Sequence, residues 1–209
     1  MVEVKICGVR EERALAAAVE AKADWVGFVF YPPSPRALPP AMAARLAQRL
    51  PKAGPSPAGL FVAPSDDDLA RTLESLALAA LQVHGVSPER AAAIQARFAV
   101  PVWHAAGVAS AADLPAMAPG VSRLLMDRKP ETTDPLPGGN ARSFDWSVLR
   151  DWAAPVPWML AGGLTPNNVA NAIRQTGAPA VDVSSGVESS RGMKDPALIR
   201  DFVDAVRSA

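Results

Sequence analysis

Two side chains that could move protons stand at the ends of short apolar segments. Cys7 ends the segment 2–7, and Asp127 ends the segment 123–127. A thiolate can act as a general base and a carboxylic acid as a general acid, provided that one substrate reaches both. Each residue also has an ordinary alternative role, the cysteine as a small buried apolar side chain and the aspartate as a turn or capping residue. The hypothesis of an acid–base pair therefore requires a fold that brings the two segment ends together.

Small residues gather at two positions late in the chain. Gly162 and Gly163 form the first group, and Ser184, Ser185 and Gly186 form the second. Such residues let backbone amides approach an anion closely, especially beside the start of a helix. The two groups predict a phosphate site, with tight turns alone as the alternative.

Four further polar residues could contribute to the same site. Arg36 lies in a proline-rich loop that could hold its guanidinium for bidentate contact with a carboxylate, although a solvated loop arginine is the alternative. His84 and His104 could titrate near neutral pH or serve as hydrogen-bonded residues at the edge of the core. Lys5 stands two residues before the cysteine and could tune the pKa of its thiol.

Short apolar segments alternate with alanine-rich helical segments along the whole chain. The predicted strands are residues 2–7, 25–30, 58–62, 78–84, 102–104, 123–127, 158–161 and 180–183. The predicted helices are residues 11–21, 40–50, 66–76, 88–98, 111–117, 145–152, 166–175 and 196–206. This alternation is typical of parallel strands joined by crossover helices. Eight such units in 209 residues leave about 26 residues each, which predicts an α/β fold with one (βα)8 barrel domain over residues 1–209.

Local signals support this division of the chain. Ser65, Ser87, Thr165 and Asp195 each precede a predicted helix, as capping residues do. A doubly wound open sheet is the competing architecture, but the first predicted strand is not followed by a G-x-G-x-x-G sequence. In a barrel the carboxyl ends of all strands surround one mouth, so the candidate residues would meet there. Two long connections, 31–40 and 128–143, are expected at this end and suggest a lid or a substrate clamp.

The composition excludes several classes of function. The chain has 21 basic and 21 acidic residues, so no positive field would attract nucleic acid or a membrane surface. Two histidines and one cysteine make a structural zinc site unlikely, and we expect no metal. We also expect no signal peptide and no membrane span, because no basic leader or apolar run of sufficient length is present. A single cysteine cannot form an internal disulfide, which favours a reducing compartment such as the cytoplasm.

Seven motifs follow one another along the chain, namely KICG at 5–8, DWVGFVFYPPSPR at 24–36, GLFV at 59–62, LQVHG at 81–85, FDW at 144–146, LAGGLTPNN at 160–168 and VDVSSGVE at 181–188. Together they resemble the motifs of the phosphoribosylanthranilate isomerases of tryptophan biosynthesis. The resemblance covers nearly the whole chain. It implies a (βα)8 barrel enzyme that needs no cofactor and acts on a small phosphorylated substrate. The implied reaction is the Amadori rearrangement of N-(5-phosphoribosyl)anthranilate to 1-(2-carboxyphenylamino)-1-deoxyribulose 5-phosphate.

The resemblance also implies a role for each site residue. Cys7 would be the general base that takes the C2′ proton, and Asp127 the general acid that protonates the ring oxygen. Arg36 would hold the anthranilate carboxylate, and Asp182 would help to order the opened sugar. The phosphate would bind backbone amides around Gly162, Gly163, Ser184, Ser185 and Gly186, with Lys5 and His84 as further candidate contacts.

Other interpretations remain open at this stage. A phosphopentose epimerase would need more metal ligands, and a histidine-pathway isomerase would have an aspartate where Cys7 stands. A barrel that only binds a phosphorylated ligand would need neither Cys7 nor Asp127. The sequence departs from the family pattern at Val86, Arg128, Asn140 and Ala141, so the behaviour of the loop 128–143 cannot be transferred. The sequence allows either a monomer or a homodimer, and acceptance of a histidine-pathway substrate stays open.

Overall fold

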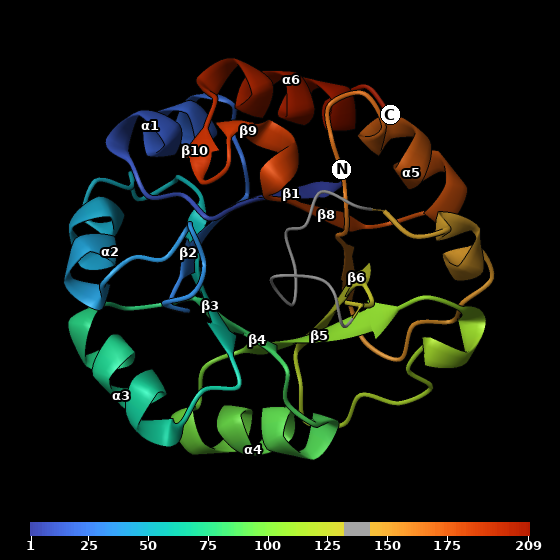
Figure 1. The fold of residues 1–209 in the computed structure, drawn as a ribbon, viewed down its shortest axis with the longest axis horizontal. Helices are drawn as coiled ribbons and strands as arrows, with labels where there is room; N and C mark the ends of the chain where they lie inside the picture. Colours follow the sequence, from blue (N-terminus) through green and yellow to red (C-terminus); the bar gives the residue numbers. More distant parts are fainter. Residues whose placement is uncertain (132–142) are drawn as a thin grey trace.

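The computed structural model describes residues 1–131 and 143–209. Eight parallel strands form a closed barrel, in which each strand pairs with the next and the last pairs with the first (Figure 1). These strands are β1 (Glu3–Cys7), β2 (Trp25–Val29), β3 (Ser56–Val62), β4 (Ala80–His84), β5 (Val102–Val108), β6 (Arg123–Arg128), β7 (Trp158–Leu160) and β8 (Ala180–Val183). The barrel predicted from the alternating segments is therefore confirmed.

Six α-helices surround the barrel in the described residues (Figure 1). They are α1 (Glu12–Glu20), α2 (Pro40–Ala47), α3 (Asp66–Ser75), α4 (Pro88–Phe98), α5 (Val169–Thr176) and α6 (Pro196–Arg207). Three predicted caps are present, because the side chains of Ser65, Ser87 and Asp195 accept hydrogen bonds from backbone amides in the first turns of α3, α4 and α6. Over the described residues, no helix combines the length and the apolar character that a membrane crossing requires.

Three helix predictions were wrong in part. The segment 111–117 forms only a single 3₁₀ turn, η1 (Ala111–Asp113), because Pro115 disfavours helical geometry at the residue before it. The segment 145–152 forms another short 3₁₀ helix, η2 (Trp146–Leu149), in place of an α-helix. Thr165 does not cap α5, which begins three residues later than predicted, at Val169 after a turn. Most of the connection 128–143 lies outside the described residues.

A small hairpin that the sequence did not predict follows β8. It contains η3 (Ser185–Val187), β9 (Glu188–Ser190) and β10 (Met193–Lys194), and the two strands pair antiparallel. Strands of two and three residues carry too few positions to show an apolar alternation. In Figure 1 the hairpin lies beside α1 and α6.

The end of the barrel away from the mouth is closed by aromatic and charged side chains. Trp25 and Trp103 meet edge to face, with ring centroids 4.6 Å apart, although they come from β2 and β5. The guanidinium of Arg123 stacks on Trp103 and pairs with Glu3 at 2.9 Å. Trp25 Nε1 also donates to Glu3 Oε2 at 2.9 Å. This floor joins four strands and keeps the polar chemistry at the other end of the barrel.

Candidate active site

The thiol of Cys7 lies inside the barrel beside the ammonium group of Lys5. Lys5 and Cys7 are two positions apart on β1, so both side chains lie on the same face of the strand, which faces into the barrel. Both lie against Gly27 of β2, where an added methyl group would be 3.0 Å from Cys7 Sγ and 3.1 Å from Lys5 Nζ. Lys5 Nζ also donates to Asp182 Oδ1 of β8 at 2.8 Å. The glycine therefore leaves the space in which the thiol and the ammonium group meet.

Opposing influences act on the Cys7 thiol. Burial raises its pKa above the usual value, and the carboxylate of Asp182 raises it further. The ammonium groups of Lys5 and Lys194 oppose this rise. Burial alone would lower the pKa of Lys5, but the charges of Asp182 and Cys7 outweigh it, and the pKa is raised. Lys5 thus remains an ammonium group next to a thiol that is hard to ionise.

Asp127 occupies the mouth of the barrel at the end of β6. Burial of the carboxyl group raises its pKa to about 7, and the charge of Asp182 adds to this effect. The amide of Arg128 donates to Asp127 Oδ1 at 2.8 Å and opposes the rise only in part. Asp182 influences the pKa of both Cys7 and Asp127. At neutral pH the carboxyl group therefore holds a proton in a large share of the molecules, as a general acid must.

The loops after β7 and β8 contact each other at the predicted phosphate site. Gly162 and Gly163 have φ angles of +83° and +67°, which favour glycine. A methyl group on Gly186 would collide with the carbonyl oxygen of Leu164, so the absence of a side chain permits this contact. Asn168 holds the first loop through Oδ1, which accepts from the Thr165 amide at 2.8 Å, and through Nδ2, which donates to the Gly163 carbonyl at 3.0 Å. The two small-residue groups thus come together through the contact of Gly186 with Leu164.

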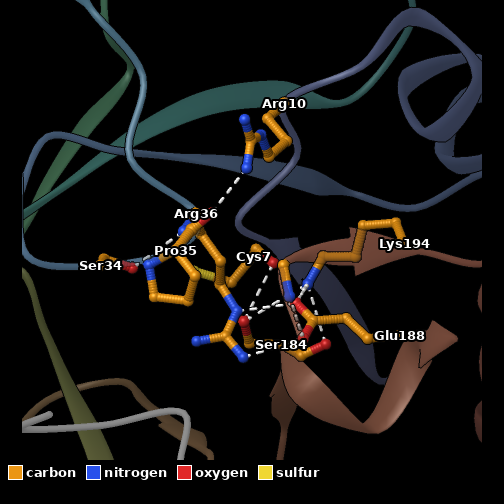
Figure 2. Close-up of polar contacts among 9 residues, drawn as sticks. Cys7, Arg10, Ser34, Pro35, Arg36, Ser184, Glu188 and Lys194 are labelled. Atoms are coloured by element: carbon orange, nitrogen blue, oxygen red, sulfur yellow. Dashed lines mark hydrogen bonds and ion pairs between the residues drawn. The ribbon is translucent and has the colours of Figure 1, made fainter. Parts of the chain in front are cut away.

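Arg36 is buried and paired, so its alternative role as a solvated loop residue is wrong. Its Nε donates to Glu188 Oε1 at 2.7 Å and its Nη2 to Glu188 Oε2 at 2.9 Å, a bidentate contact (Figure 2). The preceding loop is anchored by Arg10, whose Nη1 donates to the Pro35 carbonyl at 2.7 Å. Ser34 Oγ accepts from the Arg36 amide at 3.2 Å. The guanidinium thus has a fixed orientation.

Lys194 of β10 also contacts the carboxylate that holds the arginine. Its Nζ donates to Glu188 Oε1 at 2.8 Å and to the Ser184 carbonyl at 2.9 Å (Figure 2). Burial alone would raise the pKa of Glu188, but the hydrogen bond from Arg36 and the charge of Lys194 lower it to about 2. Ser184 Oγ in turn donates to the Cys7 carbonyl at 3.2 Å. A continuous chain of polar contacts thus links the arginine to the backbone of Cys7.

The two histidines differ in their surroundings. His84 is buried, and its Nε2 lies 2.8 Å from the side-chain amide nitrogen of Gln82, which donates to it. Burial and the charges of Lys5 and His104 lower the pKa of His84 to about 4, so it is neutral at pH 7. His104 Nε2 lies 3.0 Å from the Val86 carbonyl and lies at the edge of the core. Contact between His84 and substrate stays a prediction.

Most of the sequence-predicted residues lie at one end of the barrel. Lys5, Cys7 and Asp182 cluster inside it. Asp127 lies against Gly162, where an added methyl group would be 3.0 Å from Oδ1, and Ser184 contacts the Cys7 carbonyl. No role was predicted for Gln82, Glu188 or Lys194. Gln82 is buried with an unpartnered Oε1, and nothing in an apolar strand signals this. Glu188 lies within a recognised motif, whereas Lys194 has no local signal because only the unforeseen hairpin turns it inward. In the described part of the chain, no group of three or more histidine, cysteine, aspartate or glutamate residues could hold a metal ion.

The closed barrel and the acid and thiol at its mouth define the chain as a (βα)8-barrel enzyme. The family model of N-(5'-phosphoribosyl)anthranilate (PRA) isomerase matches residues 4–205, and the chain belongs to this family. The N-(5'-phosphoribosyl)anthranilate isomerases of Granulibacter bethesdensis and Paramagnetospirillum magneticum are 52% and 51% identical to it, each alignment covering at least 97% of both chains. Among solved structures, phosphoribosyl anthranilate isomerase from Thermotoga maritima is similar with a TM-score of 0.85 at 33% identity, over 100% of both chains.

Proposed function

We propose that the chain catalyses the Amadori rearrangement of N-(5'-phosphoribosyl)anthranilate in tryptophan biosynthesis, with Cys7 as general base and Asp127 as general acid. The observation that carries this proposal is the Asp127 carboxyl group, whose pKa is raised to about 7 at the mouth of the same barrel that holds the Cys7 thiol. A related phosphoribosyl anthranilate isomerase, 33% identical with a TM-score of 0.83, was solved in complex with reduced 1-(o-carboxyphenylamino)-1-deoxyribulose 5-phosphate. Its ligand is a phosphorylated carboxylate.

The reaction divides into two proton transfers. The protonated Asp127 gives its proton to the furanose oxygen while the C1′–O bond breaks and the anilino nitrogen forms an iminium bond to C1′. The Cys7 thiolate then takes the C2′ proton. The electron pair of the broken C2′–H bond forms the C1′–C2′ double bond of an enolamine, and the iminium nitrogen becomes neutral. Tautomerisation yields the ketone, so no atom is gained or lost. A general acid and a general base of this kind each accelerate such steps by about 10²–10⁴-fold.

Two anion sites would hold the substrate across this pair. Arg36 binds the anthranilate carboxylate, since a fixed guanidinium matches a planar carboxylate. The backbone amides of Gly162, Gly163, Ser184, Ser185 and Gly186 bind the phosphate. Asp182, held by Lys5, orders the hydroxyl groups of the opened sugar. Anchoring both ends of the substrate places C2′ and the ring oxygen near their catalytic groups, which supplies much of the acceleration.

The reaction as proposed needs no metal or cofactor, because both steps move only protons. We also propose a cytoplasmic enzyme, supported by the single cysteine, which is free and buried. All residues of the proposed site come from one chain, so the site is compatible with a monomer and with a homodimer.

The test is a fluorescence assay in which anthranilate, phosphoribosyl pyrophosphate and an anthranilate phosphoribosyltransferase form the labile substrate in place. Wild type should accelerate the decay of substrate fluorescence, and Cys7→Ala should lose about 10²-fold or more of this activity. Ser65→Ala, which removes only the cap of α3, serves as the matched control and should keep full activity. If wild type leaves the decay unchanged, the proposed reaction is wrong, and if Cys7→Ala is fully active, the base is another group.

A further inference from the structure

Arg36, Glu188 and Lys194 form a buried ionic cluster, called here the Arg36 cluster. The arginine is 4% exposed and the lysine 1%, and the glutamate side chain is 4% exposed. Glu188 Oε1 accepts from both Arg36 Nε and Lys194 Nζ, and its Oε2 accepts from Arg36 Nη2 and the Gly192 amide. Oε1 of the single carboxylate is therefore shared between the two cations, and Oε2 is held by the arginine and a backbone amide. The formal charge of the cluster is one unit positive.

The contacts of Lys194 Nζ match an ammonium group. Burial lowers the pKa of Lys194, and the carboxylate of Glu188 opposes this effect. Three acceptors surround Lys194 Nζ, namely Glu188 Oε1 at 2.8 Å, the Ser184 carbonyl at 2.9 Å and Ser184 Oγ at 3.4 Å. Ser184 Oγ uses its own proton to reach the Cys7 carbonyl, so its oxygen is left to accept. An ammonium group has three donors and no acceptor, which matches this environment.

We propose that Lys194 is a positioning residue whose charge lets Arg36 hold both Glu188 and the substrate carboxylate. This inference rests on the proposed function, because it concerns the same carboxylate. Without Lys194, Arg36 and Glu188 would form a neutral pair. The substrate carboxylate and Glu188 would then repel each other, with Arg36 as the one cation for both. With Lys194, one net positive charge remains, which neutralises one carboxylate of the ligand.

The position of the hairpin brings Lys194 into contact with residues beside both proposed anion sites. Figure 2 shows its side chain between Glu188 and Ser184. Through Glu188 it fixes the guanidinium, and through Ser184 it fixes the end of β8, where the phosphate loop begins. The distance between the two anion sites is therefore set partly by one side chain from β10.

The test compares two ligands by calorimetry. One is reduced 1-(o-carboxyphenylamino)-1-deoxyribulose 5-phosphate, and the other is the same molecule without its carboxyl group. The ratio of their dissociation constants measures the carboxylate preference. Lys194→Met should reduce this ratio by at least about tenfold, with a smaller change for the ligand that lacks the carboxyl group. The exposed Lys52→Met, before β3 at the opposite end of the barrel, should leave the ratio unchanged.

A double variant separates charge from shape. Glu188→Gln together with Lys194→Met restores one net positive charge on Arg36 at nearly constant side-chain volume, and it should recover much of the carboxylate preference. A buried charged pair can often be replaced in this way without loss of folding, which circular dichroism would check. Equal weakening of both ligands by Lys194→Met, or an unchanged ratio, would overturn the inference. If wild type binds neither ligand, the proposed function itself fails.

Discussion

At the scale of single residues, the protonation of Asp127 and Cys7 decides when the site is active. Burial raises the pKa of both groups, that of Asp127 to about 7 and that of the thiol above its usual value. The active form needs the acid protonated and the base ionised, so only a minor share of molecules carries both states at once. Substrate turnover then depends on pH through both groups together.

Asp127→Asn tests this balance in two ways. Below pH 7 the wild-type kcat/KM should rise with pH as thiolate forms, and it should level off near pH 7 as Asp127 loses its proton. The variant should be about 10²-fold or more slower, and its residual rate should continue to rise beyond pH 7. If the kcat/KM of the variant also levels off near pH 7, the group that titrates there is not Asp127.

The same variant should change stability with a definite sign. The pKa of Asp127 is about 7 in the folded chain against an ordinary 3.8, so folding is opposed once the unfolded chain ionises. The cost is absent at pH 3, grows between about pH 4 and 7, and is complete at pH 8. Urea unfolding should therefore show Asp127→Asn to be more stable than wild type by roughly 2–4 kcal/mol at pH 8 and nearly equal at pH 3. Equal stability at pH 8 would contradict the raised pKa.

At the scale of elements, what the sequence predicted depended on how local the signal was. Strand segments and the caps Ser65, Ser87 and Asp195 are local features, and they were predicted correctly. The segment 111–117 was not, because Pro115 outweighs the helical spacing of its alanines. Cys7, Asp127 and the small-residue loops could be predicted because each lies at the end of a strand or directly after it.

The roles of Lys194 and Glu188 could not be predicted from the local sequence. Their roles depend on a hairpin turn that returns β10 to Arg36, which is more than 150 positions earlier in the chain. Burial of a lysine at 1% exposure has no local sequence signature, because lysines are usually exposed.

Gly27 of β2 gives an element-scale prediction. Gly27→Ala would place a methyl group 3.0 Å from Cys7 Sγ and 3.1 Å from Lys5 Nζ, so the thiol and the ammonium group must move. We expect kcat to fall by about tenfold or more and stability by roughly 1–3 kcal/mol. Ser65→Ala is the control, with about 1 kcal/mol less stability and unchanged kcat in the same fluorescence assay. Full activity of Gly27→Ala would show that the thiol does not need this position.

At the scale of the whole molecule, closure of the barrel joins the two ends of the chain. β1 pairs with β8, and α6 packs on α1. Arg207 of α6 donates to the carbonyls of Val2 and Lys22 and to Asp24 Oδ2, and Asp24 also accepts from the Val4 amide at 2.8 Å. One side chain near the C-terminus therefore ties the start of β1 to the segment that precedes β2.

Arg207→Ala should lower the free energy of unfolding by about 1–2 kcal/mol, because the half-buried carbonyl of Val2 and the exposed carbonyl of Lys22 lose a charged donor. Arg200→Ala changes an exposed arginine of the same helix and should have an effect within about 0.5 kcal/mol. Urea unfolding at pH 7 measures both, and kcat should be the same for both variants since α6 does not line the mouth. Equal stability of the two variants would show that Arg207 does not secure the closure.

The indole pair in the barrel floor gives the closed barrel an optical signature. Trp25 and Trp103 belong to β2 and β5, which β3 and β4 separate in the barrel, yet their rings are 4.6 Å apart at an interplanar angle of 78°. Chromophores so close and so steeply inclined couple their excited states, which produces a pair of circular dichroism bands of opposite sign. This exciton signal requires the sheet from β2 to β5 to be curved as it is in the barrel, whereas the helical signal does not. Comparing the two during refolding would therefore distinguish the curving of the sheet from the formation of helices.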